Sequence, residues 1–160
     1  MESLAQTSNN ALLPVDASPV EMRRDAARFP RVCTMTREDA IAQMLGVVEA
    51  AALYRGRKLD ADELGFTASA LVDEILADQR WGLRYISFAE IRRAVRRAVL
   101  ETEMYGVSVA TLYKALVDYA RGEGTAARNT IDAQTRRKTG AQILAEASAA
   151  EMINQQRKKR

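Results

Sequence analysis

Apolar residues recur every three or four positions through the middle of the chain, which is the spacing of one buried face of an α-helix. Each of these stretches follows a Ser, Thr or Asp that can cap a helix N-terminus. The pattern predicts four helices: from Thr36 to about Tyr54, from Asp60 to about Asp78, from Phe88 to about Leu100, and from Ser108 to about Arg121. Short turns join them, and we expect Trp81 to close the bottom of their shared core.

The two ends of the chain lack this sustained pattern. Residues 1–35 hold all three prolines and are expected to form a flexible leader, with a short helix around residues 20–28 capped by Ser18. A Gly- and Thr-containing segment, residues 122–130, follows the fourth helix and is expected to be a linker. A weaker, alanine-rich helix is expected from Ala141 to about Gln155.

The sequence therefore predicts an all-α protein with three parts. The first is a flexible leader over residues 1–35, and the second is a compact orthogonal four-helix domain over residues 36–121. The third is a linker and basic helical arm over residues 122–160. No strand of any length is predicted, because period-two alternation is absent outside Arg84-Tyr85-Ile86.

Positive charge is concentrated at the C-terminal end. Residues 36–120 carry 11 basic and 13 acidic side chains, whereas residues 121–160 carry nine basic and four acidic ones. Such an arm is attracted to phosphate without sequence preference, although a basic end also serves as a solubilising tail. Its candidate DNA-binding residues are Arg136, Arg137, Lys138, Arg157, Lys158, Lys159 and Arg160.

The third predicted helix has two distinct faces. At 100° per residue, Phe88, Ile91 and Val95 fall on one side, and four arginines occupy an arc of about 140° on the other. These arginines are Arg92, Arg93, Arg96 and Arg97. They either form a stripe that contacts phosphates or a solvated face whose charges pair with neighbouring acids, and the sequence leaves both interpretations open.

The stretch over residues 106–116, Gly-Val-Ser-Val-Ala-Thr-Leu-Tyr-Lys-Ala-Leu, resembles the turn and recognition helix of helix-turn-helix proteins. The similarity is closest to the Gly-Val-Ser-x-x-Thr-Leu-Tyr phrase of resolvase and invertase DNA-binding domains. The resemblance implies that Val109, Ala110, Thr111 and Lys114 face a major groove or its phosphates. The sequence departs from the pattern at Thr102, where a small apolar residue is usual.

A second resemblance extends from about Thr36 to Arg121. A helical N-terminal half is followed by Ser-x-x-Glu-Ile, the turn Tyr105-Gly106 and a helix that ends in Asp118-Tyr119. This order is similar to that of small uncharacterised helical proteins of prophages and conjugative elements, some of which share the layout of phage replicative helicase loaders. The resemblance implies a helical, non-enzymatic adaptor.

The composition argues against an enzyme. The chain has no histidine and a single cysteine, so a His-activated nucleophile and the usual zinc ligand sets are excluded. The Asp60, Asp62 and Glu63 group is explained by helix capping, and we expect no metal and no cofactor. No apolar run reaches the length of a membrane span, and neither a membrane partner nor a secretory signal is expected, which favours the cytoplasm.

Together these patterns predict a non-catalytic, DNA-associated accessory protein of replication or regulation from a mobile element. Its expected partners are DNA and a replication protein or further copies of itself. The alternative is a protein-interaction or structural, virion-associated helical protein that makes no direct contact with nucleic acid.

Overall fold

The computed structural model describes residues 16–101 and 106–158, and the side chains of this part as far as residue 149. Its elements are helices joined by turns, and the only strand-like pairing among the described residues is an isolated bridge between Arg31 and Ser87. The prediction of an all-α fold is therefore confirmed.

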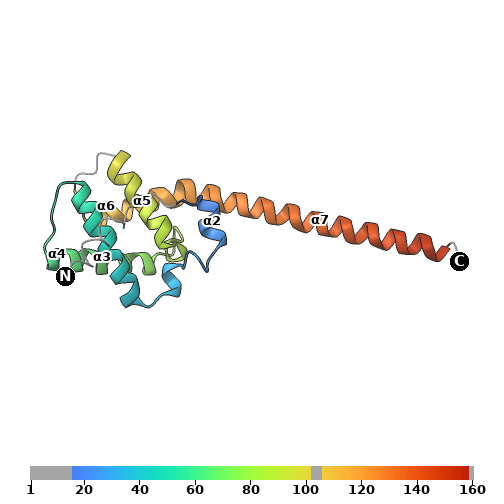
Figure 1. Ribbon diagram of the computed structural model, residues 1–160, viewed down its shortest axis with the longest axis horizontal. Coiled ribbons are helices and arrows are strands. Elements are labelled where there is room, and N and C mark those ends of the chain that lie inside the picture. The colour runs from blue at the N-terminus through green and yellow to red at the C-terminus, as the bar shows by residue number, and fades with distance from the viewer. Residues whose placement is uncertain (1–15, 102–105, 159–160) are drawn as a thin grey trace.

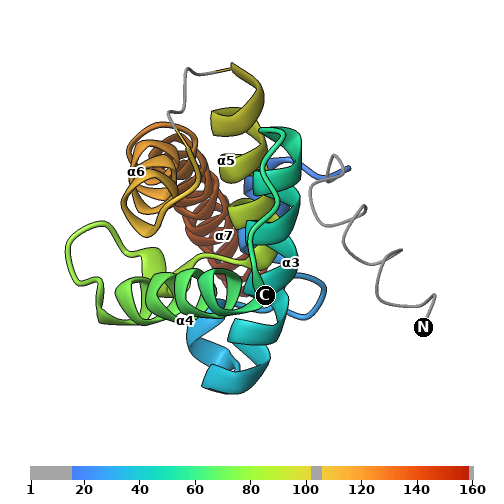
Figure 2. The ribbon, with the colours of Figure 1, turned by 90° about the vertical axis from the view of Figure 1, so that its left-hand side faces the viewer.

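Four helices enclose the core. They are α3 (Arg37–Tyr54), α4 (Ala61–Ala77), α5 (Phe88–Glu101) and α6 (Val109–Tyr119). Helices α3 and α4 cross steeply, and α6 packs against α4 and α5 (Figure 2). Met44, Leu71, Ile91, Leu112 and Leu116 are fully buried between them, because the apolar stripe of each helix faces the shared core.

Capping groups set where these helices begin. The Asp60 carboxylate accepts a hydrogen bond from the Glu63 backbone N–H at 2.8 Å, and the Thr36 hydroxyl accepts one from Asp39 at 3.1 Å. Gly56, with φ of 67°, follows α3 in the left-handed region that favours glycine. These local signals are the ones that the sequence displays, and the observed bounds of α3 and α4 agree with the predicted ones.

The linker expected over residues 122–130 is helical instead. The backbone passes from α6 through a π-helical turn, η3 (Ala120–Gly124), directly into α7 (Thr125–Lys158). The Thr125 hydroxyl donates to the Ala120 carbonyl at 2.8 Å, and Ala127 is buried. A Cβ on Gly124 would lie 3.0 Å from the Arg23 guanidinium and 3.4 Å from the Tyr119 carbonyl, so glycine gives the tightest neighbours of this turn more room.

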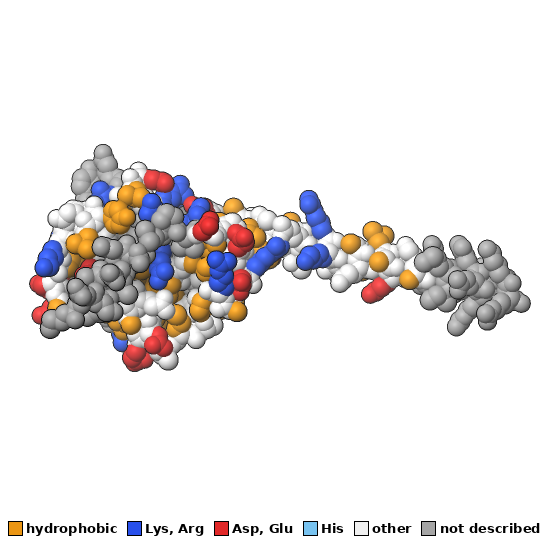
Figure 3. Space-filling model, in the orientation of Figure 1, with side chains coloured by type: hydrophobic (Ala, Val, Ile, Leu, Met, Phe, Trp, Pro, Cys, Tyr) orange, Lys and Arg blue, Asp and Glu red, His pale blue; other side chains and the backbone are white. Residues whose placement is uncertain are grey.

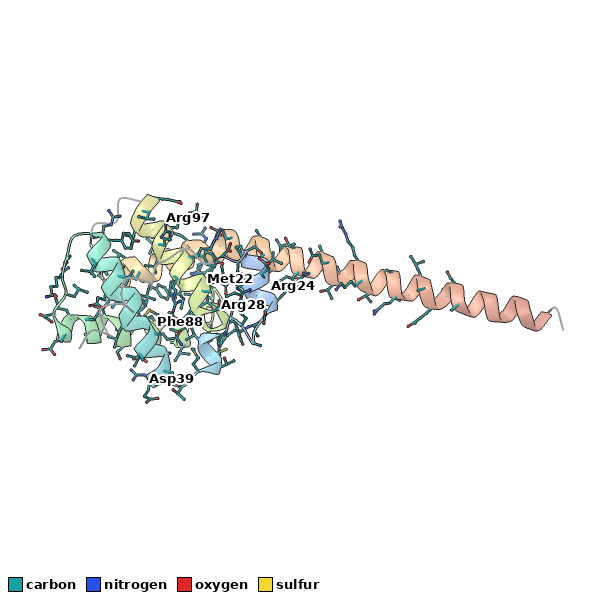
Figure 4. All side chains as sticks on the ribbon, viewed as in Figure 1. Met22, Arg24, Arg28, Asp39, Phe88 and Arg97 are labelled. Carbon is teal, nitrogen blue, oxygen red and sulfur yellow. The ribbon has the colours of Figure 1, made fainter. Side chains whose placement is uncertain are left out.

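Part of the expected flexible leader is also folded. Ser18 caps a short helix, α2 (Pro19–Arg24), as the sequence predicted, and this helix packs against α7 and α5 (Figure 4). Met22 is 1% exposed, and Val32, in the 3-10 turn η1 (Val32–Thr34), is completely buried. The remainder of the predicted leader, residues 1–15, lies outside the described residues.

Helix α7 continues far beyond the body of the protein (Figure 1). Arg24 of α2 donates a hydrogen bond to the side chain of Gln134, and residues 135–149 are all exposed. The helical arm thus begins at Thr135 as a direct extension of a packed helix, and not as the separate helix expected from Ala141.

A buried carboxylate joins three segments of the fold. Glu90, in the first turn of α5, is 1% exposed. Its carboxylate accepts hydrogen bonds from the Ser87 backbone N–H at 3.0 Å and from the Tyr119 hydroxyl at 3.3 Å. Arg23 Nε of α2 lies 2.9 Å from its Oε1 atom as an ion pair, although this N–H is not directed along a hydrogen bond. Glu90 therefore links α2, α5 and α6.

The hydrogen bond between Tyr119 and Glu90 lies in a buried site that changes the pKa of Tyr119. Burial of its hydroxyl, and then the negative charge of Glu90, raises the pKa of Tyr119 far above its ordinary value. The phenol therefore stays protonated and continues to donate to Glu90 when exposed tyrosines have ionised.

We expect Glu90→Gln to lower the free energy of unfolding by about 3 kcal/mol, because it leaves the Arg23 guanidinium beside a neutral group in a largely buried site. Urea denaturation followed by far-UV circular dichroism measures this. The control is Glu74→Gln on the exposed side of α4, for which a change below about 0.5 kcal/mol is expected. Equal losses in the two variants would contradict the structural role of Glu90.

Stability should also fall at high pH through Tyr119. Above about pH 10 the unfolded chain releases this proton while the folded chain keeps it, so the free energy of unfolding falls by up to about 1.4 kcal/mol per pH unit. Tyr119→Phe should remove that component of the slope, whereas Tyr54→Phe, at an exposed position, should retain it. Urea denaturation at several pH values compares the three proteins. Parallel slopes for wild type and Tyr119→Phe would reject the assignment.

Candidate nucleic-acid interface

The arginine face of α5 is partly neutralised by an acid from η3. Arg93 Nε donates to one carboxylate oxygen of Glu123 at 2.7 Å, and Arg97 Nη1 donates to the other at 3.0 Å. Arg97 also pairs with Glu101 at 3.0 Å, and the hydrogen bond to Glu101 and its charge raise the pKa of Arg97. These two guanidinium groups are thus engaged within the protein.

The other two arginines of this face are less open than a helical projection suggests. Arg92 and Arg96 are half-buried, and the Nε atom of Arg92 is buried without a hydrogen bond. The structure therefore combines the two interpretations that the sequence left open. The face carries four arginines, and acids pair with Arg93 and Arg97.

The helix-turn-helix-like stretch forms a capped helix whose capping groups are occupied. Gly106 has φ of 108°, and Ser108 caps α6. The Thr111 hydroxyl accepts from the Ser108 N–H at 2.9 Å and lies 3.2 Å from the Gly106 carbonyl, so it holds the turn. Residues 102–105, which would complete the motif, lie outside the described residues.

The remaining candidate residues of this stretch leave little accessible surface for a contact with DNA. Lys114 pairs with Asp118 at 2.6 Å, Val109 is half-buried, and Ala110 is exposed. Of the four residues implied to face DNA, Thr111 and Lys114 thus have partners within α6 and its N-terminal turn.

The basic residues of the arm are the most accessible candidates. Arg136, Arg137 and Lys138 are exposed on the projecting part of α7, and Figure 3 shows basic side chains standing away from the helix there. Within the described part of the chain, none of the three forms an ion pair. The side chains of residues 157–160, the other arm candidates, are outside the described set.

A further cluster of basic side chains lies around Trp81, for which the sequence predicted only a contact with the core. Trp81 is half-buried against the core, and two guanidinium groups lie over its ring: Arg80 at 4.7 Å and Arg121 at 5.4 Å from the ring centre. Arg128 of α7 approaches the adjacent Gly82, with Nη1 3.7 Å from the position of a Cβ there. Trp81 thus packs against the core, as the sequence predicted, and two guanidinium groups also lie over its ring, which the sequence did not predict.

Sequence reasoning missed this set because its members are far apart in the chain. The dipeptides Arg80-Trp81 and Arg84-Tyr85 are the only local signal, and the guanidinium of Arg84 lies 5.4 Å from the Tyr85 ring centre. Arg121 and Arg128 come close to the Trp81–Gly82 turn only through the packing of η3 and α7. A linker was expected there from the sequence, so this packing was not predicted.

The acidic residues offer no metal centre among the described residues, where no group of three or more His, Cys, Asp or Glu side chains is arranged to hold an ion. Asp60 caps α4, and Glu63 pairs with Arg57 at 2.9 Å. No helix in the described ranges is long and apolar enough to cross a membrane.

No protein-family model, curated protein or solved structure matches this chain.

Proposed function

We propose that this protein is a non-catalytic accessory protein that associates with DNA in the replication or regulation of a mobile element. The observation that supports this best is the projecting arm of α7 (Figure 1), on which Arg136, Arg137 and Lys138 are exposed.

The arm suits a phosphate backbone for electrostatic reasons. Consecutive residues of a helix differ by 100°, so these three charges extend over an arc of about 200° around α7. A helix with this distribution contacts phosphates on more than one side when it lies along DNA. Such contacts release counterions, require no base recognition and fit an accessory protein better than a sequence-specific regulator.

The candidate residues of α5 and α6 contribute less to DNA binding in this proposal than those of the arm. Glu123 offsets part of the charge of Arg93 and Arg97, and Thr111 is engaged in the turn before α6. The resemblance of the predicted layout to that of phage helicase loaders supports a replication protein as the second partner, with the helical body as the docking module.

The triple variant Arg136→Gln/Arg137→Gln/Lys138→Gln should weaken DNA binding and make it less sensitive to salt. The slope of log affinity against log salt concentration should fall by about 0.9 for each phosphate contact removed from duplex DNA. Fluorescence anisotropy with a labelled duplex across a salt series measures both quantities.

The matched control, Arg28→Gln/Arg57→Gln/Lys58→Gln, removes the same charge from exposed positions of the body. It should keep the wild-type slope. Equal slopes for the two triple variants would exclude a specific contribution of the arm, and absence of binding by the full chain near physiological salt would reject DNA association.

One observation favours a second function, assembly through protein contacts. Ile143 and Leu144 are 60% and 70% exposed on the projecting helix. Over residues 135–149 the other side chains of the arm are alanine, glycine and polar residues. Two adjacent large apolar side chains that are exposed in this setting are typical of a helix that packs on a partner. This is the virion-associated or structural alternative that the sequence left open.

The two proposed functions predict different molecular masses for the protein in solution in the absence of DNA. An assembling arm gives species that are multiples of 17.7 kDa in sedimentation equilibrium, and Ile143→Glu/Leu144→Glu returns them to the monomer. A protein that acts through the basic arm alone stays monomeric in both forms.

A further inference from the structure

The cluster formed by Arg80, Trp81, Arg121 and Arg128, hereafter the Trp81 cluster, has the features of a nucleic-acid contact on the folded body. We propose that it binds single-stranded DNA. This inference rests on the proposed DNA association and assigns to it a site separate from the arm.

Within the described residues, the charges of the Trp81 cluster have no acidic partner. Arg80, Arg121 and Arg128 are exposed, and among the described residues none of them pairs with an acid. Arg128 donates only to the Thr125 hydroxyl, at 3.2 Å. This distinguishes the cluster from the α5 face, where Glu123 offsets two arginines.

The one carboxylate in the turn is turned inward. Asp78 is 7% exposed and accepts from the backbone N–H groups of Trp81 at 3.1 Å and Leu83 at 2.8 Å, and from the Tyr113 hydroxyl at 3.2 Å. Its charge is therefore used to hold the turn. Gly82, with φ of 72°, permits the reversal that brings Trp81 against Arg121.

The stacked geometry prepares the guanidinium groups for phosphate. A guanidinium that lies over an indole ring is held by cation–π attraction and keeps its in-plane N–H donors available to an anion. The two stacked groups, together with Arg128 beside Gly82, can contact successive phosphates of a strand. The ordering of the arginines before binding lowers the entropy cost of each contact.

The aromatic rings favour a single strand over a duplex. Tyr85 is 50% exposed and lies four residues after Trp81, with Arg84 over its ring. Exposed rings beside phosphate-binding arginines provide stacking surfaces for unpaired bases, whereas duplex bases are already stacked on one another. An acidic peptide would use the arginines but gain nothing from the ring of Tyr85.

Trp81 is the only tryptophan of the chain, so its fluorescence reports on this site directly. We expect titration with an unlabelled thymidine oligonucleotide to change the Trp81 emission of the full chain. Arg80→Gln/Arg121→Gln should weaken this response at least about tenfold, since it removes two phosphate contacts. The control Arg28→Gln/Lys58→Gln removes the same charge and also an arginine stacked on an aromatic ring, Phe29, at 5.0 Å. It should leave the response unchanged.

Three results would overturn the inference. The first is binding of a labelled oligonucleotide, detected by anisotropy, without any change in Trp81 emission. The second is an equal loss of oligonucleotide affinity in the two double variants. The third is displacement of the labelled strand by polyglutamate or duplex DNA as effectively as by unlabelled strand. In each of these cases DNA association through the arm stands. Absence of any anisotropy change, with duplex or single strand, rejects the proposed function as well. Thermal unfolding by circular dichroism verifies that each variant is folded.

Discussion

The buried carboxylate of Glu90 is the contact on which the arrangement of the fold depends. A charge withdrawn from water is stable only if its surroundings replace the lost hydration, and Ser87, Tyr119 and Arg23 do so from three different segments. Arg23 also lies close to Gly124 of the π-helical turn η3, where a Cβ would stand 3.0 Å from its guanidinium. Because α2 packs against α7, these contacts connect the Glu90 network to the base of the arm.

The core helices could be predicted because their starts depend on residues close in sequence. The packing of α2 and the continuation of α6 into α7 could not, because they depend on contacts between residues far apart in sequence. The starts of α3 and α4 depend on hydrogen bonds between residues three positions apart, which any reader of the sequence can find. Glu90 also satisfies that local rule as the partner of Ser87, and nothing nearby indicates that it is buried against Arg23, 67 positions earlier. Gly124 looked like part of a linker, because glycine disfavours helices unless packing requires it.

The candidate sites divide in the same way. A helical projection correctly placed the arginines of α5 on one side of the helix, but the acid that offsets Arg93 is Glu123, which lies 30 positions later. At Trp81 the sequence predicted the contact with the core but not the arginine that η3 brings over its ring, Arg121. Sequence spacing therefore locates charge on an element, whereas tertiary packing decides whether that charge is available.

The replacement of a linker by a helix changes how the two proposed DNA contacts relate to each other. A flexible linker would let the arm and the body bind independently, with an effective concentration set by its length. Here Arg121 and Arg128 of the Trp81 cluster and Arg136 to Lys138 of the arm lie on one unbroken helical path. At about 1.5 Å per residue, the path from Arg121 to Lys138 is about 25 Å long. A strand held at Trp81 is thus presented to the arm at a fixed distance, because the helical path between the two contacts is continuous.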